Sequence, residues 1–385
     1  MNKKALGFAV AVALMSTSAL AVSPYGNSQQ KGSLLVFPRI DVSHGRDTLI
    51  LITNDYSGEV NVKCYYQSTD GSDITKKWRT DFQFRLTQNH PAHFWASTGQ
   101  SIGDSVFKQN VARMQDWANS TDYSSSAKPP EAGELKCWAT NAAGTAEIHH
   151  NHLVGMATVV DRAQAYSYNA IAFQALVGGN ASENTGNVIG TDHTLLLDGK
   201  MYDKCAYQAV GQFRPTGQHD FEWYNGLTVA DRGTSYNAQV TLVACDQDLR
   251  QDYKPPLTKV TYEFWNQDEV KFTGTHQCID SWYERDLSYF PEARYTALKT
   301  ESAYFRATGV QSSLCDKIGP TAGRGLMGVL VQSQSAFSPW DSVQADGKPF
   351  GDIRLHGLTL NARGSIDGSI KYDYSLGNPG DIVKK

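Results

Sequence analysis

A serine flanked by glycines is the sharpest chemical motif in the sequence. Residues 99–103 (GQSIG) match G-x-S-x-G, in which the glycines permit a strained turn that presents a serine nucleophile. In a secreted hydrolase Ser101 would be that nucleophile, and His149, His150 or His152 would supply the general base. Because a chain with 33 glycines readily produces this pattern by chance, we favour an ordinary glycine-rich turn.

Two groups of residues could bind a metal ion. His150 and His152 would project from the same face of a strand and could share a zinc or copper ion, but the sequence marks no third ligand. Asp246 and Asp248 could reach one calcium ion in an irregular loop, although they lack the glycine spacing of an EF-hand. A polar strand edge and a solvated linker explain the same residues. We therefore expect no cofactor and keep calcium and zinc as alternatives.

Four aromatic residues are candidates for ligand binding, because exposed rings can stack on sugars or anchor a protein partner. They are Trp138, Trp223, Tyr224 and Trp282. Trp138 is out of phase with the core-facing positions of its predicted strand, which would expose it. Ordinary packing under long loops is the favoured alternative for all four.

The N-terminal residues have the three parts of a secretory signal peptide. Lys3 and Lys4 form a short positive region, residues 5–14 are an uncharged apolar run, and residues 19–21 (ALA) provide small side chains at a cleavage site. The apolar run is too short to span a bilayer of roughly 30 Å as a helix, so a retained anchor is the less favoured alternative. We expect cleavage after Ala21, export to the periplasm, outer surface or extracellular space, and no transmembrane span thereafter.

The charge balance argues against nucleic acid as a partner. The 385-residue sequence has 35 Lys and Arg against 39 Asp and Glu, a net charge of −4, and both signs are mixed along the chain. Binding to phosphates would need a basic stripe. The expected partner is instead a protein or glycan at the cell surface, or further copies of the same chain.

Six cysteines follow the predicted signal peptide, and an even count in an exported chain predicts three disulfides. They are Cys64, Cys137, Cys205, Cys245, Cys278 and Cys315, and none lies in a C-x-x-C pair. Six cysteines allow fifteen pairings. We favour sequential pairing, in which each cysteine joins the next one along the chain.

The strand pattern supports the first of these pairs. Cys64 shares its strand face with Val60 and Val62, and Cys137 shares its face with Leu135, so both thiols should point into a core. Such a bridge would join facing sheets. Closing the loop between the two cysteines could contribute roughly 4 kcal/mol in the chain-entropy model.

Short alternating segments separated by Gly, Asn, Asp and Ser turns predict an antiparallel all-β fold. The alternation is clear in residues 60–66 and 81–86, and the apolar spacing in residues 105–117 predicts a helix. We predict two antiparallel, immunoglobulin-like β-sandwich modules with long loops and one or two short helices.

A charged stretch at residues 246–256 ends in two prolines and is the best candidate for a module boundary. The predicted division is a signal peptide at 1–21, a first β-sandwich module with loop excursions at 22–252, a second module at 253–373 and a flexible tail at 374–385.

Several of these segments resemble the immunoglobulin-like sandwiches of bacterial envelope and secreted proteins. The resemblance rests on residues 47–54, 60–64 and 82–86, and residues 260–269 resemble the opening of a second such module. It covers about half of the chain and implies a fold type, together with a role as spacer or binding platform. It transfers no functional residue.

Taken together, the sandwich pattern, the disulfides and the lack of a complete catalytic set favour a noncatalytic protein. We expect a secreted or cell-surface protein for binding, adhesion or extracellular assembly. Because fold does not fix function, a secreted hydrolase using Ser101 and a carbohydrate-binding protein stay as alternatives.

Overall fold

The protein is all-β, as predicted, in the part of the chain that the structure describes. A computed structural model describes residues 25–70, 73–102, 109–116, 130–161, 164–176, 188–191, 197, 199–219, 222–223, 227–228, 234–245, 258–279, 282–310, 315, 325–336 and 350–360. All strand pairs in these ranges are antiparallel. Three single helical turns lie there, at η1 (Leu287–Tyr289), η2 (Pro291–Ala293) and α1 (Tyr295–Leu298).

The first sandwich consists of two sheets, which we call sheets I and II. Sheet I has the order β5 (Pro91–Trp95), β2 (Arg46–Asn54), β8 (Leu153–Asp161) and β9 (Gln164–Asn169). Sheet II has the order β10 (Ile171–Phe173), β1 (Leu34–Asp41), β6 (Ala132–Thr140), β3 (Val60–Asp70) and β4 (Asp73–Leu86), and β7 (Ala146–Ile148) and β11 (Val188–Thr191) extend it beside β6. Aromatic and aliphatic side chains from both sheets form its core.

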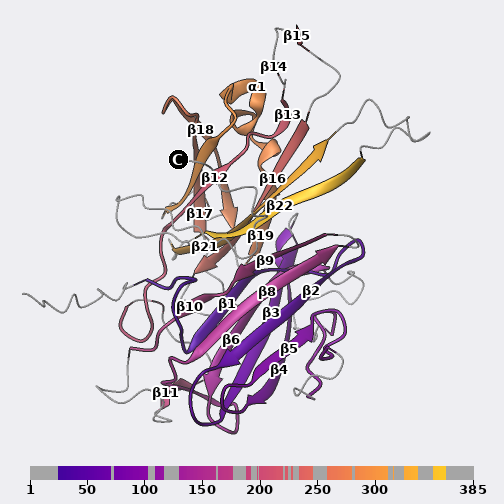
Figure 1. The fold of residues 1–385 in the computed structure, drawn as a ribbon. Coiled ribbons are helices and arrows are strands. Elements are labelled where there is room, and N and C mark those ends of the chain that lie inside the picture. The colour runs from indigo at the N-terminus through magenta and orange to yellow at the C-terminus, as the bar shows by residue number, and fades with distance from the viewer. Residues whose placement is uncertain are drawn as a thin grey trace, which may run out of the picture.

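The second sandwich consists of sheets III and IV. Sheet III has the order β13 (Gly217–His219), β16 (Thr234–Cys245), β21 (Gly325–Ala336) and β22 (Phe350–Leu360), with β19 (Trp282–Asp286) also paired to β16. Sheet IV has the order β12 (Gln208–Phe213), β20 (Ala303–Val310), β17 (Thr258–Trp265) and β18 (Lys271–Ile279). Figure 1 shows this sandwich above the first one.

The two sandwiches share a third hydrophobic core between sheets II and III. Leu34, Trp138 and Phe173 from sheet II contribute to it, together with Val243 and Met327 from sheet III. Strands β1 and β6 therefore bury both of their faces, and every residue of β1 is buried. Strands of the outer sheets, such as β2 and β17, alternate because only one of their faces is buried.

The strands group differently from the predicted division at residues 252 and 253. Strand β12 pairs with β20, and β16 pairs with β19 and β21. Residues 208–245 thus supply strands to the second sandwich although they precede residue 253. Pairing between strands distant in the sequence leaves no local sequence pattern from which the division could be predicted. The charged stretch at 246–256, on which the predicted boundary rests, lies outside the described residues.

The predicted sequential disulfide pairing is confirmed. The bonds are Cys64–Cys137, Cys205–Cys245 and Cys278–Cys315. The expectation that the first bond joins facing sheets is wrong, because Cys64 in β3 lies directly opposite Cys137 in the neighbouring strand β6, with the two Cα atoms 4.1 Å apart. Both cysteines face the first core, so the strand-face argument was correct while the sheet assignment was not.

The described part of the predicted helix at residues 105–117 is not helical. Residues 109–116 contain turns and irregular backbone. The N–H of Val111 donates to the carbonyl of Gly99 at 3.1 Å, and that of Met114 donates to the carbonyl of Ala96 at 2.8 Å. The segment is therefore a loop that is hydrogen-bonded to the turn after β5. Its apolar spacing reflects the side chains of Val111 and Met114, which reach the first core.

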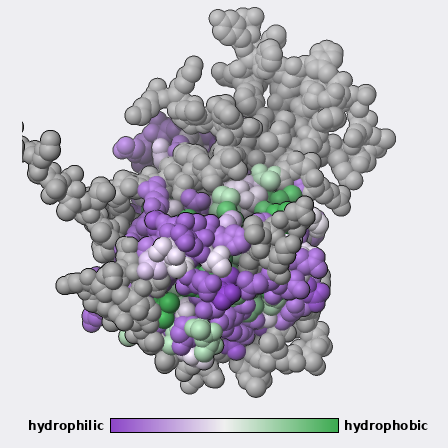
Figure 2. Space-filling model, turned by 60° about the horizontal axis from the view of Figure 1, so that its bottom comes forward, coloured by the Kyte–Doolittle hydropathy of each residue, from purple (hydrophilic) through white to green (hydrophobic). Residues whose placement is uncertain are grey.

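The outer surface of the first sandwich is predominantly polar. Figure 2 shows mostly hydrophilic side chains among the described residues on this face, with hydrophobic ones in small separate groups. Scattered apolar residues of this kind are usual on protein surfaces and do not mark an interface.

A buried ion cluster joins the two sandwiches at β1. The register of β1 opposite β6 shifts around Arg39, whose side chain is fully buried. Arg39 Nη2 lies 3.1 Å from Asp41 Oδ2, and Nη1 lies 2.8 Å from Glu284 Oε2 and 3.2 Å from Thr241 Oγ1. Because Thr241 and Glu284 belong to sheet III, one guanidinium holds sheet II against sheet III.

This cluster makes the stability depend on pH. Burial raises the pKa of Glu284 above its ordinary value of 4.5, and the charge of Arg39 offsets this only in part. The ionised carboxylate therefore costs stability at neutral pH, and the cost disappears as the pH falls through the folded pKa towards 4.5. Burial also raises the pKa of Asp41, but the charges of Arg39 and Arg46 and the hydrogen bonds from Ser43 together outweigh it. The net pKa is lowered, so stability from Asp41 is lost only below about 3.8.

We expect the protein to be more stable at mildly acidic pH than at neutral pH, and E284Q to reduce that difference. The measurement is the urea midpoint of unfolding at both pH values for the two proteins. Burial also raises the pKa of Asp203, which therefore acts in the same direction. Because E284Q retains Asp203, the difference in stability between the two pH values should shrink without vanishing. An unchanged difference in E284Q would show that Glu284 is not responsible.

Candidate functional site

Ser101 lies in a turn that folds back on β5. The N–H of Gly99 donates to the carbonyl of Trp95 at 2.8 Å, and Ser101 forms an isolated bridge with Phe94. Gly99 has φ +66°, and a Cβ atom there would lie 2.0 Å from the carbonyl oxygen of Val111. The glycine is thus explained by its backbone conformation and by the close approach of a neighbouring loop.

The histidine cluster lies too far from Ser101 to act as its base. Phe94, which bridges to Ser101, pairs with Ile50 in β2. His150 Nε2 contacts Asn54 Oδ1 at 2.9 Å, and Asn54 is the last residue of the same strand, four residues after Ile50. Four residues of strand span roughly 13 Å, whereas a nucleophile and its base must be within hydrogen-bond distance.

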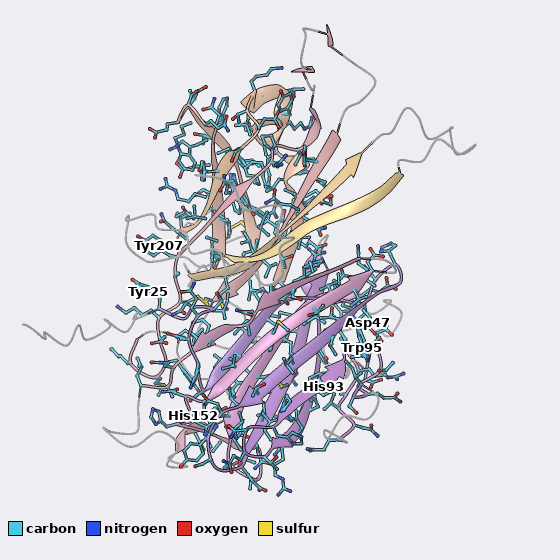
Figure 3. All side chains as sticks on the ribbon, in the orientation of Figure 1. Tyr25, Asp47, His93, Trp95, His152 and Tyr207 are labelled. Carbon is cyan, nitrogen blue, oxygen red and sulfur yellow. A yellow bond between two sulfur atoms is a disulfide. The ribbon has the colours of Figure 1, made fainter. Side chains whose placement is uncertain are left out.

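His150 and His152 lie together but in the turn between β7 and β8, not on a strand. Their ring centroids are 5.2 Å apart. His150 contacts Asn54, and His152 Nδ1 lies 2.8 Å from Asp55 Oδ1. Among the residues that the structure describes, no three His, Cys, Asp or Glu side chains are grouped so that they could hold a metal ion. Figure 3 shows His152 on the opposite side of the first sandwich from Trp95.

Two of the four candidate aromatic residues are core residues. Trp138 is fully buried in the shared core and packs edge-on against Tyr65, with ring centroids 5.6 Å apart. Trp282 is 9% exposed, and its Nε1 donates to the carbonyl of Pro38 at 2.9 Å. Neither ring has a face open to a ligand, because both lie in the core between sheets II and III. The face of β6 that was predicted to be exposed at Trp138 is covered by the second sandwich.

The remaining candidates receive little or no structural description. Tyr224, Asp246 and Asp248 lie outside the described residues. Trp223 belongs to β14 (Glu222–Trp223), which pairs with β15 (Leu227–Thr228), and only its backbone pairing is described.

A polar hollow on the outer face of sheet IV is a better candidate for a binding site. Its volume is about 320 Å³, near the lower end of the roughly 300–1,000 Å³ found for small-molecule sites. All four strands of the sheet line it, and the side chains are Gln208, Lys259, Thr261, Glu263, Thr273, Thr275, His276, Arg306 and Thr308. Tyr262 and Gly274 complete the lining.

The strand register explains why the surface is hollow at this place. Gln208, Thr308, Thr261 and His276 form one row across the four strands. The two threonines in the middle of this row are short, while Lys259 stands in the row on one side and Glu263 and Arg306 stand in the row on the other. The register of β17 and β18 also shifts between the positions of Thr261 and Glu263. The threonine hydroxyls therefore form a floor.

An ion cluster forms one wall of the hollow. Glu263 accepts hydrogen bonds from Arg306 Nε at 2.7 Å and from Arg306 Nη2, and its other oxygen pairs with Lys271. Partial burial raises the pKa of Glu263, but the hydrogen bonds from Lys271 and Arg306 outweigh it, so the net pKa is lowered. The carboxylate is thus ionised at neutral pH and holds the guanidinium in one orientation.

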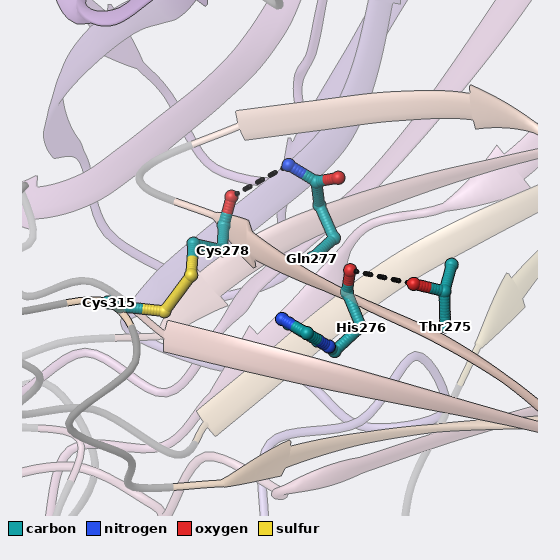
Figure 4. The surroundings of a disulfide bond; sticks show 5 residues. All are labelled: Thr275, His276, Gln277, Cys278 and Cys315. Atoms are coloured by element: carbon teal, nitrogen blue, oxygen red, sulfur yellow. Dashed lines mark hydrogen bonds between the residues drawn. A yellow bond between two sulfur atoms is a disulfide. The ribbon is translucent and has the colours of Figure 1, made fainter.

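An aromatic row lies beyond this wall. Trp265 pairs with Tyr304 across β17 and β20, and Tyr304 is 39% exposed. The Arg306 guanidinium carbon lies 5.1 Å from the centroid of the Trp265 ring. At the opposite end of the hollow Lys259 pairs with Cys278, whose disulfide to Cys315 is drawn with the neighbouring His276 in Figure 4.

Comparisons with known proteins do not identify the chain. No family model matches the sequence. No curated protein matches it either. Among solved structures, the crystal structure of PBSX exported protein XepA aligns over 80% of this chain and 84% of that chain, at 10% identity and a TM-score of 0.17. A TM-score this low bears on neither fold nor function.

The helices in the described ranges are single turns, so none of them is a candidate for crossing a membrane.

The hollow could not be predicted from the sequence, although part of sheet IV could. The resemblance predicts that residues 260–269 open a second module, but nothing in the sequence marks the outward residues Thr261 and Glu263 as part of a binding site. Their partners Thr308 and Arg306 are more than 40 residues away, so only the strand register brings the four together.

Proposed function

We propose that the chain is an exported, noncatalytic binding protein whose ligand-binding surface is the hollow on sheet IV. The observation that carries the proposal is the clustering of polar side chains from four strands around a threonine floor. Each side chain there stands on a paired strand, so the surface is preorganised and loses little conformational entropy on binding.

Export is supported by the signal-like N-terminus and by the three disulfides. Disulfides persist in oxidising compartments and are rare in the cytoplasm. Binding at a surface outside the cytoplasm suits a partner of the cell envelope, either a glycan or a protein. The separation of Ser101 from the histidine cluster removes the main support for a hydrolase.

Filling the hollow is expected to abolish binding to envelope material. Thr261→Tyr would place a ring on the hollow's floor, and because tyrosine suits an outward strand position the fold should be retained. The purified protein and the variant would be incubated with envelope material from the producing organism, sedimented, and the bound fraction measured. We expect at least a tenfold loss of the bound fraction in the variant.

Lys63→Gln is the matched control. Lys63 lies on β3 in the first sandwich, where it pairs with Asp81; its side chain is 18% exposed and takes no part in the lining of the hollow. This variant should sediment like the unchanged protein. If T261Y bound as strongly as the unchanged protein while keeping its unfolding midpoint, the hollow would not be the binding surface.

A further inference from the structure

We infer that the hollow on sheet IV recognises an acidic carbohydrate, a sugar ring that carries a carboxylate. This inference rests on the proposed binding function and names the ligand class of the same site. Two properties of the hollow carry it: its charge and the chemistry of its floor.

The charge of the hollow favours an anion. Lys259, Lys271 and Arg306 are cations on this face, and Glu263 is the carboxylate that faces them. Glu263 binds Lys271 and two N–H groups of Arg306. A guanidinium has five N–H donors, so Glu263 does not use all the donors of Arg306. Lys259, at the other end, is separated from this ion cluster by the row that contains Thr261. A carboxylate placed over the floor would therefore lie between Lys259 and Arg306.

Acidic groups near the sheet do not cancel this charge. Asp268 and Glu269 lie in the turn between β17 and β18, beyond the row of Trp265 and at the end opposite Lys259. They are exposed and outside the lining of the hollow. Solvent screening limits their effect across that distance.

The floor favours a sugar over a simple inorganic anion. Thr261 Oγ1 donates to the backbone carbonyl of Thr308 at 3.4 Å and keeps its lone pairs as acceptors. The Thr308 hydroxyl can donate one hydrogen bond and accept two, and the amide of Gln208 adds a donor and an acceptor. Such a set matches ring hydroxyls, which also donate and accept. A bare anion would use only donors and leave the acceptors unmatched. The volume of about 320 Å³ suits one ring rather than an extended ligand.

The aromatic row supports a sugar chain in particular. Trp265 and Tyr304 lie one row beyond Arg306 on the same face of the sheet. Aromatic rings offer a flat apolar surface next to polar groups, which suits the C–H face of the next sugar in a chain. A uronate oligomer would thus place one carboxylate between the cations and extend its neighbour over the aromatic row.

Calorimetric titration of the full mature protein with short uronate oligomers tests the inference. The panel consists of galacturonate, mannuronate and glucuronate oligomers, each compared with its methyl ester, which keeps the sugar and removes the charge. We expect at least one oligomer to bind and its methyl ester to bind at least tenfold more weakly. Lys259→Gln should weaken binding about tenfold, because one charge-assisted hydrogen bond is lost, and Lys63→Gln should leave affinity unchanged.

The outcomes separate this inference from the proposed function. If the methyl esters bound as well as the acids, or if no oligomer bound while T261Y still lost envelope binding, the acidic ligand class would be wrong and the binding surface would stand. If uronates bound equally to the unchanged protein, K259Q and T261Y, they would bind elsewhere and the inference would fail. Weaker binding at higher salt is a further expected result, because the attraction is electrostatic.

Discussion

Replacing Arg39 with alanine is expected to lower the free energy of unfolding by about 3–5 kcal/mol, the usual cost of removing one partner from a buried ion pair. Arg39 is fully buried and contacts Asp41 and Glu284, and the Asp41 side chain is 1% exposed. Without the guanidinium Asp41 keeps Arg46, whose Nε lies 3.0 Å from its Oδ2. Glu284 stays at the junction of sheets II and III with hydrogen bonds from Gln239 and Thr241 but without the cation that it contacts now. The measurement is urea unfolding followed by tryptophan fluorescence and circular dichroism.

Arg85→Ala is the control for this prediction. Arg85 pairs with Glu59 at 3.0 Å, but both side chains are more than half exposed. Surface pairs contribute at most about 1 kcal/mol, so this variant should unfold close to the unchanged protein. In the double variant R39A/E284Q part of the loss should be recovered, since one unpaired carboxylate is gone. Equal effects of R39A and R85A would contradict a role for Arg39 in joining the sandwiches.

Replacing Trp138 with alanine is expected to cost about 3–5 kcal/mol, the range for deleting a large aromatic side chain from a core. Trp138 is fully buried among residues of both sandwiches, and its ring packs against Tyr65. The cavity would open between sheets II and III, where two rigid sheets cannot easily close it. The unfolding midpoint of the full protein provides the measurement.

Trp265→Ala separates a core role from a surface role. Trp265 is half-buried on the outer face of sheet IV and contacts Arg306 and Lys271. Its removal should cost less than W138A, because the cation–π contacts that it loses contribute roughly 0.5–1 kcal/mol each at exposed sites. If W138A retained full stability and W265A did not, the assignment of Trp138 to the shared core would be wrong.

The part of the fold that the sequence predicts well is the part with one wet face. Residues 81–86 alternate between exposed and buried side chains, and they form the end of β4 as expected. The same rule misplaced Trp138, because β6 is buried on both faces and a residue out of phase with one core lies in another. Alternation indicates which residues share a face, but it does not indicate what covers that face.

Features that depend on strand register could not be predicted. The hollow requires Thr261 beside Thr308 and Glu263 beside Arg306, and these pairs exist only because β17 lies next to β20. The motif around Ser101 failed for the same reason. Its glycine spacing matched a catalytic turn, yet the path of β2 separates the serine from the histidines.

The sequential disulfides have a consequence for how the chain matures. A chain threaded through a membrane emerges N-terminus first, so under the proposed export Cys137 would follow Cys64 into the oxidising compartment before Cys205 appears. An oxidase that joins thiols in their order of arrival would reach all three native bonds, 64–137, 205–245 and 278–315, directly. Slow thiol–disulfide exchange, which takes seconds to hours, is then not needed to correct wrong pairs. Maturation should consequently require a thiol oxidase and not a disulfide isomerase.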